Sequence, residues 1–258
     1  MNKKTIGILG CGWLGLPLAQ SFIEQGHAVK GTTTQGSKLA NLTLVGIEAY
    51  HMVLHETEIK GAIDDFLSNT QVLVINVPPG LRADPSTNFP AKMRLLMERA
   101  QAHTLEQVLF VSSTAVFEDA TDFPVYTEDS IPNATSNNGN QLMKAELAVR
   151  SHYHTATIIR PGGLIGDDRN PINMLAGKTG LKNPDAPVNL VNRDYLMKLI
   201  HKIINGELLQ PLVHAVSEPQ ITRKEYYTAQ AVDSALELPQ FEKNGLQVGK
   251  FVKSNFVV

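Results

Sequence analysis

The sequence predicts an α/β fold in which a doubly wound parallel sheet is followed by a small C-terminal lobe. Short apolar runs alternate with longer amphipathic segments over the first 160 residues, a pattern typical of βαβ units. A glycine-rich turn follows the first apolar run at residues 10–15. After Pro161 glycine and proline become frequent, which indicates loops and a boundary. We therefore expect one domain over residues 1–160 and a smaller substrate-binding lobe over residues 161–258.

Length and composition are those of an ordinary globular protein. The chain has 258 residues, a formal net charge of −2 and 43% hydrophobic residues. A charge this close to zero gives no electrostatic footprint for nucleic acid or an anionic membrane, and no apolar run approaches the roughly 18 residues of a membrane span. Neither partner is expected. The single cysteine, Cys11, excludes an internal disulfide and indicates a reducing, cytoplasmic location.

Six strands are expected in the first domain, each a short apolar run bounded by polar or turn residues. They are Thr5–Leu9, Ala28–Thr32, Glu48–Val53, Val72–Val77, Gln107–Ser112 and Ala156–Arg160. The segments between them carry apolar residues three and four positions apart, which predicts helices. These are Leu14–Gln25, Ser37–Val45, Ile59–Leu67, Asn88–His103 and Asn138–Tyr153.

The C-terminal lobe is expected to begin with a loop-rich stretch after Pro161. Beyond it the sequence predicts a helix over Arg193–Asn205 and a strand over Leu212–Ala215. A last helix should open at Thr222, because Thr222 and Glu225 have the spacing of a capping box.

A glycine motif follows the first expected strand and opens the first expected helix. Gly10, Gly12 and Gly15 form G-x-G-x-x-G in that context, which is typical of dinucleotide-binding Rossmann folds. The first glycine permits a tight turn, the second lets a pyrophosphate reach bare backbone, and the third lets the helix pack on the strand. The other residues of the loop, expected to pack beside the cofactor, are Cys11, Trp13 and Leu14. The alternative is a glycine-rich turn that holds no ligand.

The end of the second expected strand indicates which nucleotide is bound. NAD enzymes usually place Asp or Glu there for the ribose hydroxyls, but no acidic residue lies between Glu24 and Glu48. Hydroxyl groups and one ammonium group stand there instead and could hold a 2′-phosphate: Thr32, Thr33, Thr34 and Lys38. NADP is therefore expected. NAD stays the alternative because the usual arginine for the 2′-phosphate is absent, and Ser37 can also serve as a helix N-cap.

The end of the fourth expected strand should also pass close to the cofactor. Asn76, Val77 and Pro78 lie there, and proline stops the strand. Two histidines four residues apart, His51 and His55, lie at a strand end and not on a helix, and no HExxH or CxxC accompanies them. We therefore expect no bound metal.

Further motifs occur in order along nearly the whole chain. Besides the glycine loop they are LFVSSTAVFED at 109–119, Tyr126-Thr-Glu-Asp129, Lys144 with Glu146, RPGGLIGDDRNP at 160–171 and VNLVNRDYL at 188–196. Together they make the chain resemble the atypical or extended short-chain dehydrogenases/reductases, which are NAD-dependent epimerase/dehydratase-like proteins, and most of all their YeeZ-like group. The resemblance implies a Rossmann domain that binds NAD(P) and a lobe that binds substrate.

The resemblance also implies catalytic residues. In the family a strand-end hydroxyl binds the substrate carbonyl or hydroxyl, and that role falls on Ser113, with Thr114 as its neighbour. A lysine, here Lys144, grips the nicotinamide ribose, and the usual tyrosine four residues before it is Asn140. Asparagine cannot transfer a proton as a phenol does. Ser113 could instead hydrogen-bond within its own loop, and Lys144 could be a solvated helix residue.

The lobe carries the remaining sites implied by the resemblance. Pro161 and Gly162 would pack on the nicotinamide, and Arg169 and Asn189 would contact the substrate. Arg169 could equally pair with the adjacent aspartates at 167 and 168. Asn192 and Asp194 read more simply as helix N-caps than as ligand contacts, as do many residues of these types.

These observations leave two functions of different classes. The first is an NADP-linked oxidoreductase or nucleotide-sugar epimerase/dehydratase-like enzyme that lacks the usual tyrosine and acts on a small polar substrate, such as a sugar- or nucleotide-linked one. The second is a non-catalytic NADP-binding redox sensor. A purely structural module would leave the glycine loop unexplained. The resemblance implies a homodimer, and the apolar end, residues 251–258, should pack as a strand or against another subunit.

Overall fold

The computed structural model describes residues 3–218 and 220–256. It contains a seven-stranded sheet of order β12-β9-β7-β6-β1-β2-β3, and the printed pairings from β9 to β3 are all parallel. The strands are β1 (Thr5–Leu9), β2 (Ala28–Thr33), β3 (Glu48–His51), β6 (Val72–Ile75), β7 (Gln107–Val111), β9 (Thr157–Pro161) and β12 (Leu212–Ala215). The predicted doubly wound fold class is confirmed.

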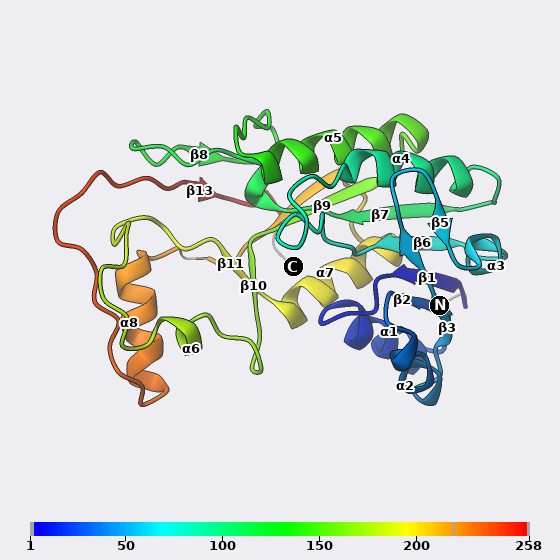
Figure 1. Ribbon diagram of the computed structural model, residues 1–258, viewed down its shortest axis with the longest axis horizontal. Helices are drawn as coiled ribbons and strands as arrows, with labels where there is room; N and C mark the ends of the chain where they lie inside the picture. Colours follow the sequence, from blue (N-terminus) through cyan, green and yellow to red (C-terminus); the bar gives the residue numbers. More distant parts are fainter. Residues whose placement is uncertain (1–2, 219, 257–258) are drawn as a thin grey trace. The chain divides into compact units, whose positions relative to one another are not determined.

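Helices cover both faces of this sheet. They are α1 (Gly15–Glu24), α2 (Leu39–Leu44), α3 (Ile63–Leu67), α4 (Phe89–Ala100), α5 (Asn137–His152) and α7 (Arg193–Ile204). The helices α4 and α5 lie side by side on one face, and α1 lies on the other (Figure 1). Side chains cap the two long helices: Asn88 accepts from the amide of Ala91, and Ser136 from that of Gly139.

The core lies between the sheet and these helices. All four residues of β6 are fully buried, which explains why this strand reads as an unbroken apolar run. Phe22 of α1, Phe89 of α4 and Phe110 of β7 are among the largest fully buried side chains. Burying a side chain of this kind stabilises the fold by roughly 1.5–3 kcal/mol relative to leaving it exposed.

The segment after β3 differs from the sequence expectation. The expected strand ends at His51, and a hairpin of β4 (Val53–Leu54) and β5 (Ile59–Lys60) replaces the first turn of the expected helix, which begins only at Ile63. Gly61 explains this. Its φ is +114°, and a Cβ there would lie 2.2 Å from the carbonyl oxygen of His51, so the backbone turns where a helix cannot start.

The expected helix over Ser37–Val45 also begins differently. A short 3₁₀ turn, η1 (Gly36–Lys38), precedes α2, and neither element has a side-chain cap. The expected N-cap role of Ser37 is therefore wrong, and its exposed hydroxyl is not engaged in capping this helix.

The chain divides into two compact units that interleave along the sequence. The first contains residues up to Ser113, Ser136–Ile159 and Ile200–Leu212, and the second contains Thr114–Thr135, Arg160–Leu199 and the residues from Val213 onward. The division expected at residue 160 stays a prediction.

The second unit contains three small packing motifs. β10 (Gly163–Ile165) pairs with β11 (Leu190–Asn192), and β8 (Val125–Tyr126) pairs with β13 (Phe251–Val252), both in parallel. The helices α6 (Ile172–Leu175) and α8 (Arg223–Asp233) share a small apolar core. The end of the chain thus packs as a strand through residues 251–252, as expected, whereas residues 257–258 lie outside the described part of the chain.

Two expected helix caps are present in the second unit. The hydroxyl of Thr222 accepts from the amide of Glu225, and the Glu225 carboxylate accepts from the amide of Thr222 at 3.0 Å. The side chain of Asn192 accepts from the amide of Asp194 at 2.7 Å. Among the described helices, none is both long and apolar enough to cross a membrane.

Candidate functional site

The glycine loop after β1 has the geometry that a dinucleotide site requires. Gly10 has a φ of +103°, and a Cβ on it would lie 2.4 Å from the carbonyl oxygen of Asn76. A Cβ on Gly15 would lie 2.1 Å from the carbonyl oxygen of Gly10. A Cβ on Gly12, by contrast, would meet nothing within 4 Å. Two of the glycines are thus demanded by packing, whereas Gly12 leaves its backbone bare toward open space.

The start of α1 adds electrostatic support at this loop. The free amides of a helix N-terminus carry a partial positive charge that favours anions. The first turn of α1 holds no acidic side chain that would neutralise this charge, and no side chain caps the helix. These features fit the pyrophosphate of a dinucleotide.

Two neighbouring strand ends hold the loop. The amide of Gly10 donates to Oγ1 of Thr32 at 2.9 Å, and the amide of Cys11 donates to the Thr32 carbonyl at 2.8 Å. From the end of β6, Nδ2 of Asn76 donates to the carbonyl of Gly10 at 3.2 Å. The side chain of Val77 also borders Gly10. The structure therefore brings together the glycine loop, Thr32, Asn76 and Val77.

The polar residues at the end of β2 fall into two groups. Thr32 and Thr33 are buried, and their hydroxyls accept from the amides of Gly10 and Gln35. Thr34 and Lys38 are exposed. The first pair shapes the turn, while the second pair is available to a ligand. Pro78 is exposed beyond β6.

Cys11 packs beneath the loop and is not poised for chemistry. Its side chain is buried, and burial raises the pKa of its thiol to about 12. A Cβ on Gly31 would lie 2.5 Å from the Cys11 sulfur, so Gly31, which the motif analysis did not single out, is needed to seat this side chain. Leu14 is buried and Trp13 is partly buried.

A buried polar pair lies at the end of β7. Oγ of Ser112 donates to Oε1 of Glu146 at 2.6 Å, and both residues are buried. Glu146 shares its face of α5 with Leu142, Ala145 and Val149, all buried. A glutamate within the apolar set of a helix was the sequence signal for this pair. Ser113, the adjacent predicted residue, is partly buried.

The side chain of Lys144 lies on another side of α5. Residues two apart on a helix do not share a face, and Lys144 is exposed whereas Glu146 is buried. Lys144 lines a surface hollow of about 490 Å³ with Arg94 and Gln141. Asn140 lies in the first turn of α5 and donates to the carbonyl of Ser136 at 3.1 Å. The catalytic roles of Ser113 and Lys144 stay predictions.

The remaining predicted residues belong to the second unit. Thr114 is buried in a 3₁₀ turn, η2 (Thr114–Val116), and Pro161 is buried at the end of β9. A Cβ on Gly162 would lie 2.5 Å from the carbonyl of Asn189, so the backbones meet closely there. Arg169 forms backbone hydrogen bonds with Gly166. Their contacts with cofactor or substrate stay predictions.

Asp168, the aspartate beside Arg169, pairs with Arg193. Oδ1 of Asp168 lies 3.4 Å from Nη1 of Arg193, and Arg193 also approaches Asp194 at 3.7 Å. Arg193 at the start of α7 thereby ties this loop to β11 and the residues that follow it.

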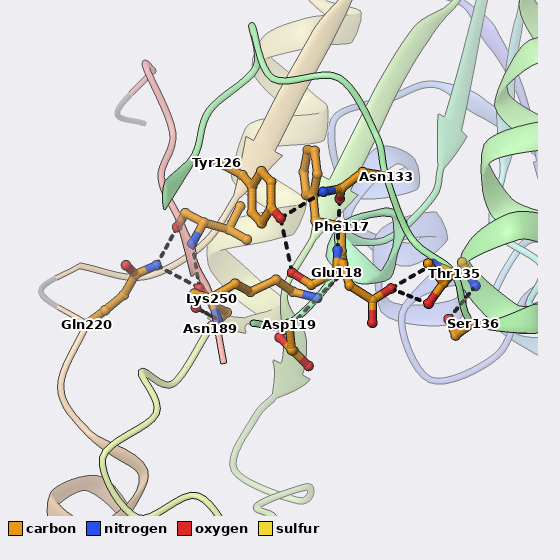
Figure 2. A network of polar contacts seen from close by, with 12 residues as sticks. Phe117, Glu118, Asp119, Tyr126, Asn133, Thr135, Ser136, Asn189, Gln220 and Lys250 are labelled. Carbon is orange, nitrogen blue, oxygen red and sulfur yellow. Dashed lines mark hydrogen bonds and ion pairs between the residues drawn. The ribbon is translucent and has the colours of Figure 1, made fainter. Parts of the chain in front are cut away.

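Asn189 holds the C-terminal segment, as Figure 2 shows. Its Oδ1 accepts from the amide of Val252 at 2.8 Å and from Nε2 of Gln220 at 3.1 Å, and its Nδ2 donates to the Lys250 carbonyl at 2.8 Å. These bonds occupy most of what the amide group can form. Its predicted contact with substrate is not tested.

Tyr126 lies in the same network (Figure 2). Its ring stacks on Phe117 with centroids 4.4 Å apart. Its hydroxyl donates to the carbonyl of Glu118 at 3.2 Å and accepts from Nδ2 of Asn133 at 3.0 Å. Lys250 approaches from the C-terminal segment, 3.4 Å from Oδ1 of Asp119.

Within residues 3–218 and 220–256, no three His, Cys, Asp or Glu side chains gather as a metal site would require. His51, one of the paired histidines, instead lies with its Nε2 3.2 Å from the carbonyl of Thr34.

Comparison with known proteins supports the same assignment of fold. No family model matches the chain. It is 31% identical over 253 residues to the protein YeeZ of Escherichia coli K12, covering 96% of this chain and 89% of that protein. Its fold matches UDP-N-acetylglucosamine 4-epimerase from Bacillus cereus, with a TM-score of 0.76 and 15% identity over 98% of this chain and 91% of that one. It also matches MoeE5 in complex with UDP-glucose and NAD, with a TM-score of 0.75 and 13% identity over 97% of this chain and 89% of that one.

Proposed function

Because the chain belongs to the YeeZ family, and because its fold is that of the epimerases and short-chain dehydrogenases/reductases, we propose that it binds a nicotinamide dinucleotide at the glycine loop and uses it on a small sugar- or nucleotide-linked substrate. The open space at Gly12 carries this proposal. Neither a positive φ nor a neighbouring protein atom requires a glycine at this position, and the second glycine of a dinucleotide-binding loop is the one that lets a pyrophosphate approach the backbone.

The chain's own groups divide the binding of the dinucleotide between them. The amide of Gly12 and the first amides of α1 face the pyrophosphate, because both are bare and uncapped. Thr32 and Asn76 fix the loop through their bonds to Gly10.

The preferred nucleotide in this proposal is NADP. The first exposed groups after β2 include Thr34 and Lys38, a hydroxyl and an ammonium suited to a phosphate. An aspartate or glutamate at this place would repel a 2′-phosphate, and the stretch between Glu24 and Glu48 has none. NAD is the cofactor in the solved complex of MoeE5, so the preference here is a departure that binding measurements can test.

When bound, the nicotinamide would supply a hydride donor or acceptor. The chain's contribution would be Ser113 at the end of β7, adjacent to the Ser112–Glu146 pair, which fixes this strand end from inside the fold. Asn140, which stands in the place of the usual general acid, cannot give or take a proton. Its side-chain amide donates to the carbonyl of Ser136. A proton would have to come from a hydroxyl or water near Ser113.

The asparagine also favours a second function, a non-catalytic sensor that binds NADP and reports its redox state. Enzyme and sensor differ in turnover and not in binding. For either, a cytoplasmic homodimer with an N-terminal nucleotide domain and a C-terminal substrate lobe is part of the proposal.

Turnover separates the two functions. NADPH oxidation is followed at 340 nm with a panel of ketones, aldehydes and UDP-sugars, and UDP-sugar interconversion is followed by chromatography with bound NADP⁺ or NAD⁺. An enzyme shows turnover with one of these, and Ser113→Ala lowers the rate. Nucleotide binding without turnover in any assay would refute the enzyme and favour the sensor.

A further inference from the structure

His51 occupies a position that the proposed function does not use. It is the last residue of β3 and pairs in register with Thr33 of β2, so it lies beside the strand end where the adenosine ribose of a dinucleotide is held in this fold class. Its side chain is exposed, and its Nε2 lies 3.2 Å from the carbonyl oxygen of Thr34.

The contact with Thr34 determines which nitrogen of the His51 ring is left to bind a ligand. A carbonyl oxygen only accepts hydrogen bonds, so Nε2 carries the proton and donates it to Thr34. The second nitrogen, Nδ1, is then an acceptor in the neutral ring and a donor in the protonated ring. The protonated ring, which carries a positive charge and a second N–H, is the form that can donate to a phosphate oxygen.

Charged groups of both signs occur in the segments that follow β2 and β3. Lys38 contributes an ammonium group on η1. Of the three glutamates in the same segment, Glu58 is paired with a cation, 3.3 Å from Nζ of Lys60. Glu48 and Glu56 accept hydrogen bonds from the hydroxyl of Tyr50 and the amide of Asn88 and keep their negative charge, so the bound phosphate depends on the cations of His51 and Lys38.

We propose that His51 determines the preference for NADP by binding the 2′-phosphate from the end of β3, together with Lys38 of η1, the turn that follows β2. This inference rests on the proposed function. It explains how the chain could select NADP without the usual arginine, because the cation comes from the neighbouring strand. If His51 only held the backbone of Thr34, its replacement would instead change the affinities for NADP⁺ and NAD⁺ equally.

The test is the ratio of the Kd values for NAD⁺ and NADP⁺, measured by isothermal titration calorimetry at pH 7 on the full chain. His51→Gln keeps a hydrogen-bond donor of similar reach for Thr34 but cannot carry charge, and His51→Lys keeps the charge. His55→Gln, four residues away in the hairpin loop, is the matched control. Thermal melting monitors folding of each variant.

We expect the unmodified protein to bind NADP⁺ more tightly, and His51→Gln to weaken NADP⁺ about tenfold, the usual loss for one charge-assisted hydrogen bond. NAD⁺ binding should change by less than about twofold, as should both nucleotides in His55→Gln, and His51→Lys should keep the preference. An unchanged ratio in His51→Gln, or equal losses for both nucleotides, would overturn this inference while leaving dinucleotide binding intact. If the unmodified protein bound neither nucleotide, the proposed function would fall as well.

Discussion

The amide of Gly10 donates a hydrogen bond of 2.9 Å to Oγ1 of Thr32, which joins the glycine turn after β1 to the end of β2. Thr32, near the end of β2, thereby belongs to the contacts that hold the glycine loop. Thr32 is 3% exposed, so its hydroxyl does not depend on water for its bond.

Replacing this hydroxyl tests the link. Thr32→Val keeps the shape of the side chain but leaves the amide of Gly10 without its acceptor, which costs about 1–3 kcal/mol for a buried donor. Urea unfolding should show this loss, and nucleotide affinity should fall because the loop loosens. Thr34→Val, at the exposed neighbouring position, serves as the control and should leave stability almost unchanged. Equal stability of Thr32→Val and the unmodified protein would show that this bond does not hold the loop.

The exposed position of Lys144 predicts a small effect on nucleotide affinity, whereas the family resemblance implies a large one. Its side chain is exposed beside Arg94 and Gln141 on the surface between α4 and α5. Lys144→Met should therefore change the Kd for NADP⁺ by less than about twofold, since the charge is screened and does not share a face with Glu146. Fluorescence titration with NADPH checks this. A large loss of affinity would instead support the ribose-binding role of Lys144 that the family resemblance implies.

His201 makes folding stability depend on pH. Its Nε2 lies 2.8 Å from Oγ of Ser21, and its ring lies 4.2 Å from that of Phe22 between centroids. Burial, and then the neighbouring His27, hold the pKa of His201 below its ordinary value of 6.5. The unfolded chain therefore binds more protons below pH 6.5. The contribution of neutral His201 to the free energy of unfolding is fully present above pH 6.5. It is lost as the pH falls toward the pKa of His201 in the folded state.

Urea unfolding from pH 5.5 to 7.5 should thus show stability rising with pH and levelling off near 6.5. His201→Gln should reduce this slope. Part of the pH dependence that remains in the variant should come from His27, whose pKa is also lowered by burial. A slope of the same size in the variant would assign the pH dependence to other groups.

Cys11 should be chemically silent in the folded protein. Burial raises the pKa of its thiol to about 12, so almost no thiolate forms at pH 8, and the buried sulfur is out of reach of reagents. Ellman's reagent should react with it only after unfolding in guanidinium. Rapid labelling of the native protein would contradict the packing role of this residue and would point to opening of the glycine loop.

The parts of the fold that could be predicted are those that depend on residues close together in the sequence. The apolar run of β6 and the glycine loop at Gly10, Gly12 and Gly15 have the predicted structure, because burial on both faces and backbone sterics leave a direct mark on the sequence. The hairpin before α3 was missed. Its cause is the approach of Gly61 to the backbone of His51, a non-local contact that apolar spacing does not reveal.

The candidate site shows the same division. Thr32 stays a predicted ligand contact, and its hydroxyl also accepts from the amide of Gly10. Spacing along a strand does not reveal this second role. The orientation of Lys144 depends on the phase of α5, which the buried set around Glu146 determines. His51 drew attention only as half of a histidine pair, since its value depends on the register between β2 and β3.

The most direct measurement is nucleotide binding to the unmodified protein and to Gly12→Val. A Cβ at Gly12 would meet no protein atom within 4 Å, so we expect the variant to fold with an unchanged melting temperature while its side chain occupies the space of the pyrophosphate. By isothermal titration calorimetry we predict NADP⁺ binding to the unmodified protein and a loss of at least about tenfold in the variant. Absence of binding of both NADP⁺ and NAD⁺ to the unmodified protein, or equal affinity in Gly12→Val, would contradict a dinucleotide site at this loop.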